Sequence, residues 1–124
     1  MSIATWKKEF YGSLKEASKS DVKALKHGIR KWTGLLPENL KKHYVWHELG
    51  EARIRDNSSI LFSVSGVSCA LCIKYVTRGT RSHSDCPIFK CDTEDDSPWV
   101  VWKNRGNPRP MIRVLKKALK EREK

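Results

Sequence analysis

All four cysteines of the chain lie within one short stretch, at positions 69, 72, 86 and 91. Cys69 and Cys72 follow the spacing C-x2-C, thirteen residues precede Cys86, and four more precede Cys91. Two short-spaced thiol pairs joined by a loop are typical of tetrahedral zinc sites, in which thiolates bind the metal. His83, three residues before Cys86, is an alternative ligand. The spacing therefore predicts Zn²⁺ bound by Cys69, Cys72 and Cys86 together with Cys91 or His83, with the all-cysteine set preferred.

Other cysteine chemistry fits the pattern less well. A redox C-x-x-C pair opens a helix within a βαβ unit, and the sequence predicts no such unit. A catalytic thiol requires an orienting histidine or asparagine, and none is evident. The spacing alone leaves an iron–sulfur cluster open. Disulfides are disfavoured because the N-terminal residues lack the pattern of a secretory signal, so a reducing cytoplasm is expected.

The remaining residues that could do chemistry do not indicate an enzyme. His43, His47 and Glu48 resemble part of a metalloprotease motif, but Glu51 stands where that motif requires its second histidine. We expect the two histidines to lie on the surface of an ordinary helix. The acidic residues Asp92, Glu94, Asp95 and Asp96 lack the spacing of a calcium loop and are expected to be solvated. With no phosphate loop, nucleophile elbow or carboxylate pair, neither an enzyme nor a small-molecule substrate is predicted.

Electric charge gives the clearest indication of a partner. The chain has 124 residues and a formal net charge of +11. The charge is +5 over residues 1–50, −1 over residues 51–102 and +7 over residues 103–124. A field of this sign attracts polyanions such as nucleic acid, an anionic membrane face or an acidic protein surface. No apolar run is long enough to span a membrane, so an integral membrane protein is not expected. Of the polyanions, nucleic acid or an acidic protein surface is predicted as the partner, and no membrane partner is predicted.

The positive charge gathers on two predicted helices. In the first, Leu14, Val22, Leu25, Ile29 and Trp32 fall within an arc of about 80°, with Ser18 or Ser20 as cap and Gly34 and Pro37 at its end. Five cations lie beside that arc: Lys15, Lys19, Lys23, Lys26 and Arg30. The second helix, residues 111–124, has an apolar face opposite its own cations: Arg113, Lys116, Lys117, Lys120 and Lys124. Faces of one sign predict contact with phosphates.

Between these helices the sequence predicts three further elements. Residues 3–11 form a turn that packs Trp6 and Phe10 on the core, and residues 37–52 form a short helix that starts at Pro37. Residues 53–66 form a β-hairpin. Residues 92–110 are expected to be a loop, an apolar patch at Trp99–Trp102 and a proline-containing linker.

The five tryptophans divide into two groups. Trp6, Trp32 and Trp46 lie where helices would bury them. Trp99 and Trp102 lie beside Lys103 and Arg105. The preferred interpretation is that they cover the small core above the zinc site. The alternative is an exposed aromatic surface that binds a partner.

A wider pattern surrounds the cysteines, formed by Cys69, Leu71, Cys72, Tyr75, Cys86, Pro87, Ile88 and Cys91. It resembles the pattern C-x-L-C-x-x-[YF], then C-x-x-C-P-[IV] and a later cysteine, of short zinc-finger-like proteins encoded by tailed bacteriophages. Those proteins are mostly of undefined function. His83 replaces the cysteine three residues before Cys-Pro, which supports His83 as a ligand. The resemblance implies expression in the cytoplasm of an infected bacterium.

Together these features predict one α+β domain over residues 1–124. Its parts are a basic helical region (1–50), the hairpin and zinc knuckle (51–102), and a linker with a basic C-terminal helix (103–124). Zinc stabilises the thin core. The predicted function is non-enzymatic binding of DNA or RNA. The alternative is a phage-encoded inhibitor that binds and disables a host protein complex.

Overall fold

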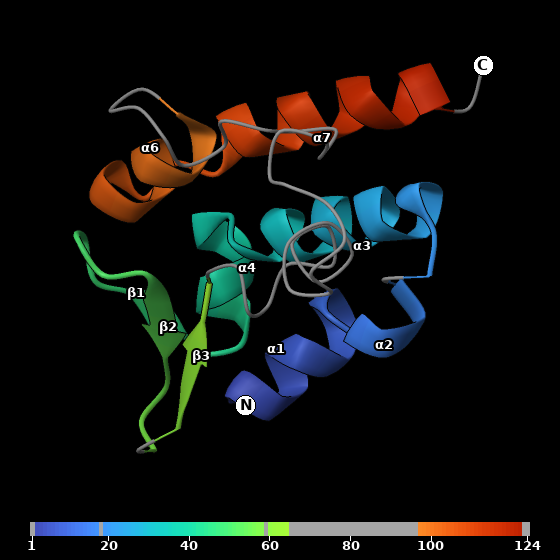
Figure 1. Ribbon diagram of the computed structural model, residues 1–124. Coiled ribbons are helices and arrows are strands. Elements are labelled where there is room, and N and C mark those ends of the chain that lie inside the picture. The colour runs from blue at the N-terminus through green and yellow to red at the C-terminus, as the bar shows by residue number, and fades with distance from the viewer. Residues whose placement is uncertain (1, 18, 59, 65–96, 123–124) are drawn as a thin grey trace.

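The computed structural model describes residues 2–17, 19–58, 60–64 and 97–122 (Figure 1). The helices are α1 (Ile3–Phe10), α2 (Leu14–Ala17), α3 (Asp21–Gly34), α4 (Pro37–Lys42), α6 (Pro98–Arg105) and α7 (Arg109–Arg122). The strands are β1 (Trp46–His47), β2 (Arg53–Arg55) and β3 (Leu61–Ser63), which form one antiparallel sheet in the order β1-β2-β3. The predicted α+β class is confirmed.

Helix α3 is the central element, with α1 and α2 on one side and α7 on the other (Figure 1). Its predicted cap is confirmed at Ser20, whose hydroxyl accepts a hydrogen bond from the Lys23 amide at 3.1 Å. The helix predicted from residue 14 onward is broken, because α2 ends at Ala17 and the Ser20 cap starts a new helix. Packing on two sides also widens the buried face of α3, which includes His27 and Lys31.

Helix α3 ends where α1 packs against it. A Cβ added to Gly34 would lie 2.4 Å from Phe10 Cγ, so only glycine allows this approach. The Trp6 indole donates a hydrogen bond to the Gly34 carbonyl at 2.8 Å, which satisfies an acceptor at the helix end. The predictions that Trp6 and Phe10 pack on the core and that Gly34 ends the helix are confirmed.

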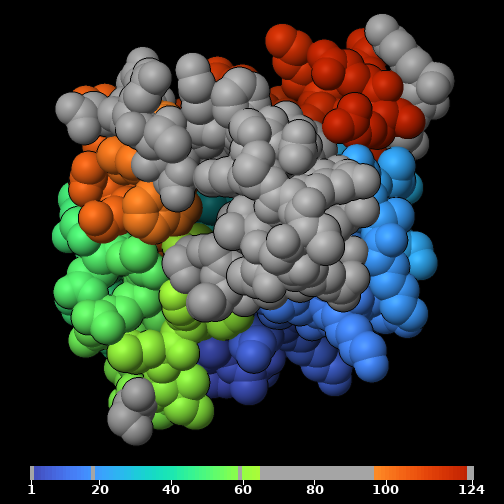
Figure 2. Space-filling model, viewed as in Figure 1, coloured from blue at the N-terminus to red at the C-terminus, as the bar shows by residue number. Residues whose placement is uncertain are grey.

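Helix α7 runs antiparallel to α3. Leu115 packs over Gly28 in the middle, and the Arg122 guanidinium lies 3.2 Å from the Asp21 carboxylate at one end. In the space-filling view, the red atoms of α7 therefore lie next to the light-blue start of α3 (Figure 2). Met111 and Leu115 are buried as the periodicity predicts, whereas Val114 is exposed.

The predicted hairpin is confirmed, with Ile54 opposite Phe62. The helix predicted over residues 37–52 is wrong beyond Lys42. Tyr44 has a φ of +55°, which turns the chain out of the helix, and Trp46 then pairs with Arg55 as β1. Backbone pairing with β2 supplies hydrogen bonds that a continued helix would have made internally, so tertiary context overrides the helical pattern.

Residues 98–105 also differ from the prediction, which gave this part an apolar patch at Trp99–Trp102 and a proline-containing linker. They form α6, with Pro98 in the first turn and Gly106 at the C-cap with a φ of +72°. The Gly106 amide donates to the Trp102 carbonyl at 2.7 Å. Proline at the start and glycine at the end are sequence signals of a helix. They were not used in the prediction, because the residues between them were interpreted as an apolar patch.

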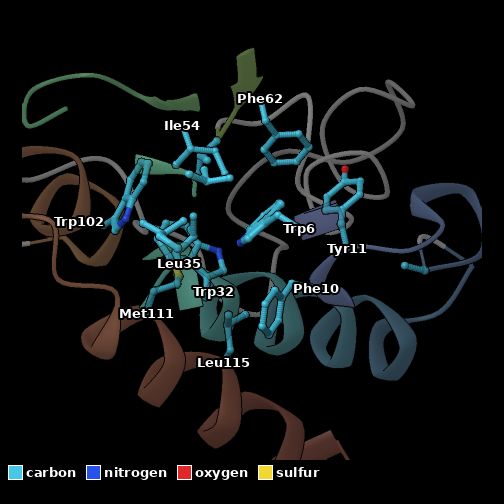
Figure 3. Packing of buried hydrophobic residues seen from close by; sticks show 14 of the residues in the cluster. Trp6, Phe10, Tyr11, Trp32, Leu35, Ile54, Phe62, Trp102, Met111 and Leu115 are labelled. Atoms are coloured by element: carbon cyan, nitrogen blue, oxygen red, sulfur yellow. The ribbon is translucent and has the colours of Figure 1, made fainter. Parts of the chain in front are cut away.

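Two groups of buried side chains, most of them aromatic, meet in the core (Figure 3). Trp6, Phe10, Tyr11 and Phe62 gather on one side, and Trp32, Leu35, Trp102 and Met111 on the other. The Trp32 and Trp102 rings make an edge-to-face contact with centroids 5.5 Å apart. The prediction that Trp46 is buried is wrong, since it is 39% exposed on the edge strand β1.

Candidate nucleic-acid interface

Helix α3 presents three exposed cations on one stripe. Lys23, Lys26 and Arg30 are spaced three and four residues apart, so they share a face of the helix. They border a hollow of about 480 Å³ between α3 and the α1–α2 segment. Ser13, Glu16 and His27 are also in its lining. The structure therefore brings the second half of the predicted stripe together around a concave surface.

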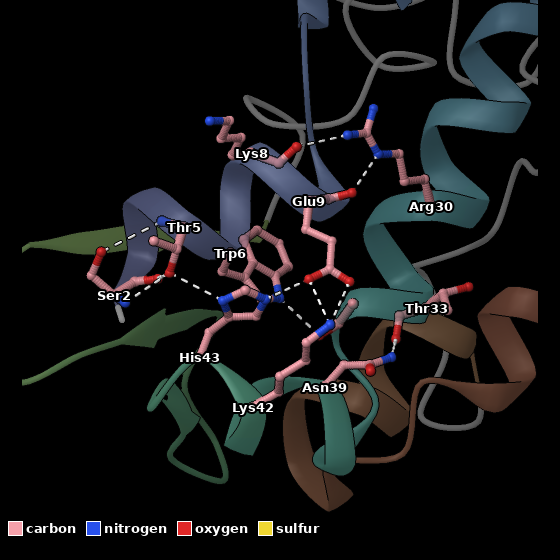
Figure 4. Close-up of polar contacts among 11 residues, drawn as sticks. Ser2, Thr5, Trp6, Lys8, Glu9, Arg30, Thr33, Asn39, Lys42 and His43 are labelled. Atoms are coloured by element: carbon pink, nitrogen blue, oxygen red, sulfur yellow. Dashed lines mark hydrogen bonds and ion pairs between the residues drawn. The ribbon is translucent and has the colours of Figure 1, made fainter.

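Arg30 is held in a defined orientation at this hollow. Its Nε donates to the Glu9 carbonyl and its Nη2 to the Lys8 carbonyl, both at 2.8 Å (Figure 4). These carbonyls belong to the last turn of α1, where the helix dipole favours a cation. Because both acceptors are neutral, the positive charge of Arg30 remains available to an anion.

The first half of the predicted stripe lies apart from α3. Lys15 is exposed on α2, and Lys19 lies in the turn between the helices. Lys19 pairs with Glu16 at 3.0 Å, and this hydrogen bond is the main cause that lowers the pKa of Glu16. Glu16 therefore offsets part of the positive charge at the hollow. The prediction of one continuous stripe from Lys15 to Arg30 is wrong, because the chain breaks its helix between Ala17 and Asp21.

Helix α7 carries the second basic face. Lys124 lies outside the described residues, and the other four predicted cations are exposed on the side opposite the buried Met111 and Leu115: Arg113, Lys116, Lys117 and Lys120. None of the four forms an ion pair within the described residues, and the same holds there for Lys23 and Lys26. Within the described residues, these six cations on the antiparallel neighbours α3 and α7 therefore have no ion-pair partner.

His27 forms part of the wall of the α3 hollow and is uncharged near neutral pH. Burial lowers its pKa from 6.5 to about 4, and the positive charges of Lys31 and Arg30 act in the same direction. The Tyr11 backbone opposes this effect in part. The Tyr11 ring meets the imidazole edge-to-face at 4.6 Å. The charge that an anion would meet at this hollow therefore belongs to lysine and arginine.

Trp99 and Trp102 differ in their surroundings. Trp102 is fully buried and stacks on His47, with ring centroids 3.9 Å apart and planes at 13°. For Trp102, the preferred interpretation that the ring packs on the core is confirmed. The alternative, in which the ring is exposed to a partner, is wrong. Trp99 is half-buried, and its indole donates to the Val64 carbonyl at 2.7 Å. Lys103 Nζ lies 5.6 Å from the centre of the Trp99 ring.

His43 and His47 are not a pair of surface residues on a helix. His43 is buried at the end of α4, with Nδ1 3.0 Å from Thr5 Oγ1 and Nε2 2.8 Å from Glu9 Oε1 (Figure 4). Lys42 joins the same carboxylate at 3.0 Å, and the hydrogen bonds from Lys42 and His43 lower the pKa of Glu9. This network ties α4 to α1. Sequence patterns miss it because its members are more than 30 residues apart.

The predicted zinc ligands Cys69, Cys72, His83, Cys86 and Cys91 lie outside the described residues, as does the acidic run at 92–96. Among the residues that the structure describes, no group of three or more His, Cys, Asp or Glu side chains is arranged to hold a metal ion. The zinc prediction therefore rests on the cysteine spacing.

A second hollow, of about 540 Å³, lies between α4, β1 and the end of α6. Three exposed apolar side chains surround it: Tyr44, Trp46 and Leu49. The sequence pattern did not indicate this site, because these residues were predicted to belong to one helix. The aromatic residues at Tyr44 and Trp46 within a basic segment were the signal that could have indicated it.

No helix in the described part of the chain combines the length and apolar character needed to cross a bilayer. No protein-family model, curated protein or solved structure matches the chain.

Proposed function

We propose that the protein is a small, non-enzymatic nucleic-acid-binding protein whose α3 and α7 faces contact phosphates. The observation that carries the proposal is the set of exposed cations without ion pairs among the described residues: Lys23, Lys26, Arg113, Lys116, Lys117 and Lys120. Like charges without ion-pair partners on neighbouring helices repel one another and destabilise the folded state. A polyanion relieves this repulsion, and binding it releases condensed counterions.

The orientation of Arg30 on α3 also favours the binding of an anion. Arg30 is anchored to the end of α1 by two hydrogen bonds, so its guanidinium loses little conformational entropy when a phosphate binds. Lys23 and Lys26 lie on the same side of α3 and add mobile point charges. Phosphate contacts of this kind position a nucleic acid without reading its sequence.

The salt dependence of binding tests the proposal. The double variant Lys23→Gln/Lys26→Gln keeps helix propensity and leaves the buried face of α3 unchanged. We expect the slope of log K against log salt to fall by about two, because each phosphate contact contributes roughly 0.9. Affinity should fall by the same factor for DNA sequences of different composition. Fluorescence anisotropy with labelled duplex and single-stranded oligonucleotides measures both quantities.

A matched control is Arg53→Gln/Arg55→Gln on β2, which removes the same net charge away from the basic helices. Both control arginines are paired with acids, at 2.6 Å to Glu51 and 3.5 Å to Glu48. The control should leave the slope nearly unchanged. Equal slopes for the α3 variant and the wild type, or no binding even at low salt, would refute the proposal.

Zinc is part of the same proposal. Cys69, Cys72 and Cys86 bind one Zn²⁺ with either Cys91 or His83, and the metal stabilises the fold. Elemental analysis of protein purified under reducing conditions should give about one zinc per chain, and Cys72→Ser should abolish it. A folded chain without metal would contradict this part of the proposal.

Chelator titration of Cys91→Ser and His83→Ala identifies the fourth zinc ligand. The variant that loses zinc at the lower chelator concentration lacks a true ligand. The all-cysteine set predicts that Cys91→Ser releases zinc first, and the resemblance to phage proteins predicts the same of His83→Ala. Equal zinc retention by the two variants would contradict both sets.

The alternative of a host-protein inhibitor relied on the basic surface together with exposed rings at Trp99 and Trp102. Because Trp102 is buried against His47 and Trp32, that hypothesis loses one of its two contact residues. The basic faces of α3 and α7 therefore carry the preferred proposal.

A further inference from the structure

The hollow between α4, β1 and α6 has unusual surroundings for a protein surface. Tyr44 and Leu49 are each 66% exposed, and Trp46 is 39% exposed. All three line the hollow, whose volume of about 540 Å³ is in the range of ligand sites. Large apolar side chains grouped on a surface in this way indicate a binding site.

The wall of this hollow contains a hydrogen-bond donor and an acceptor that lack partners. The indole N–H of Trp102 and the Nδ1 of His47 are buried, and neither has a hydrogen-bond partner among the described residues. His47 Nε2 lies 2.7 Å from the Glu51 carbonyl, which can only accept, so Nε2 carries the hydrogen and Nδ1 is the acceptor. Burial lowers the pKa of His47 and keeps the ring neutral. The two rings are stacked with their centroids 3.9 Å apart, so the donor and the acceptor belong to neighbouring rings.

Gly106 lies close to both the acceptor and the Leu49 side chain. A Cβ at position 106 would lie 3.2 Å from Leu49 Cδ2 and 3.9 Å from His47 Nδ1. Because Leu49 is mostly exposed, a change of its rotamer opens the route from the hollow to His47 Nδ1 at little cost. A ligand that offers one donor and one acceptor then satisfies both buried groups.

Tyr44 places an aromatic ring at the same hollow on a strained backbone. Its φ of +55° lies in the left-handed region, which is unfavourable for a residue with a Cβ. The ring is mostly exposed, so packing in the core offsets little of this strain. Strain of this kind is common at binding sites, where it positions a side chain for a ligand.

The charge around the hollow favours an anion. Lys41 lines it and forms no ion pair within the described residues. Arg105, adjacent to Gly106, is exposed and likewise unpaired there. The required ligand is therefore a flat heteroaromatic group with a donor and an acceptor on its edge, attached to a negative charge. Unpaired nucleotides have this chemistry.

We propose that this hollow binds an unpaired nucleobase of a single-stranded nucleic acid. The base stacks on Tyr44, its edge pairs with the Trp102 indole and His47 Nδ1, and its phosphate lies near Lys41. This inference rests on the proposed function and extends it, because the α3 and α7 faces contact phosphates alone, whereas this site recognises a base. An apolar peptide side chain is the competing occupant.

Anisotropy with paired oligomers tests this assignment. A labelled 12-nucleotide single strand is compared with an abasic oligomer of equal length and charge, at the same salt concentration. Wild-type protein should bind the single strand about 5- to 100-fold more tightly, since stacking of one base typically gives an effect of this size. Tyr44→Gly should remove most of this preference while leaving the abasic affinity unchanged. Its melting temperature should be equal or higher, because glycine accepts a positive φ.

The control variant is Ile60→Ala, which removes a side chain of similar exposure (57%) outside the hollow. It should keep the full preference for the single strand. Equal binding of the two oligomers would overturn the base site and leave the phosphate proposal standing, whereas binding of neither oligomer would overturn both. An unchanged preference in Tyr44→Gly would also overturn the base site and leave the hollow to a peptide. Adenosine monophosphate that binds as tightly as the oligonucleotide would overturn the assignment to a polymer.

Discussion

Replacement of His27 by leucine should make the protein less sensitive to acid. His27 is a buried residue of α3 on the side that faces the end of α1. Neither of its ring nitrogens has a hydrogen-bond partner of good geometry in the described part of the chain. Burial together with the charges of Lys31 and Arg30 lowers its pKa from 6.5 to about 4. Leucine removes the titrating group and both unsatisfied nitrogens, and loses only the edge contact with Tyr11.

The size of the effect follows from the two pKa values. Between pH 6.5 and about 4 the unfolded chain binds a proton at His27 that the folded chain does not bind. The free energy of unfolding is therefore unaffected above this window and falls as the pH decreases through it. From about pH 7.5 to about pH 5 the loss amounts to about 2 kcal/mol. Solvent at the adjoining hollow screens the charges and reduces the expected value to about 1–1.5 kcal/mol.

Urea denaturation at the two pH values measures this difference. The free energy of unfolding of wild-type protein should fall by about 1–1.5 kcal/mol more than that of His27→Leu. His47, whose pKa is also lowered, titrates in both proteins and so cancels from the comparison. Lys26→Gln, a change of an exposed residue at the same hollow, should behave like the wild type. Equal losses in wild type and His27→Leu would refute the reasoning.

Three further substitutions test the packing by thermal or urea denaturation. Trp102→Ala should lower the free energy of unfolding by about 3–5 kcal/mol, because it empties a fully buried site, and a loss below about 1 kcal/mol would contradict that burial. Gly34→Ala should lower the melting temperature clearly, since its Cβ would lie 2.4 Å from Phe10 Cγ, and Phe10→Leu in the same chain should restore part of the loss. Asp56→Ala should lower the melting temperature at neutral pH, because Asp56 Oδ2 accepts a hydrogen bond from the buried Ile3 amide at 2.7 Å. An unchanged melting temperature would show that this link between the sheet and α1 is unimportant.

The contribution of Asp56 to stability depends on pH in the direction that is usual for a carboxylate. The hydrogen bond from the Ile3 amide is the main cause that lowers its pKa, and a hydrogen bond from Ser58 adds to it. Its contribution to stability is therefore present at neutral pH and is lost as the pH falls through the lowered pKa. The Asp56→Ala protein should accordingly show a smaller loss of stability than the wild type below about pH 4.

Local sequence signals determined several elements correctly. The serine cap and terminal glycine of α3, the turn residues of the β2–β3 hairpin and the apolar periodicity of α7 all act within a few residues of one another. Such signals depend on backbone hydrogen bonds and side-chain directions that short segments set for themselves. The exposed cations of α3 and α7 belong to the same category, because a charged stripe at helical spacing remains on the surface wherever the helix packs.

Only the tertiary structure decided which secondary structure residues 43–52 and 97–106 adopt. Trp46 and His47 carry a helical pattern but pair with β2, and the aromatic residue Trp102 becomes a core residue because α6 presses it against His47 and Trp32. The Glu9–His43 contact and the hollow around Tyr44 likewise join segments that are distant in sequence or turned by a strained residue. The sequence alone thus determined the Ser20-capped helix α3, the helix α7, the hairpin and the exposed cations of these two helices, because those signals lie close together along the chain. Contacts between distant segments decided which aromatic rings are buried and which surround a hollow, because burial depends on the packing of the whole core.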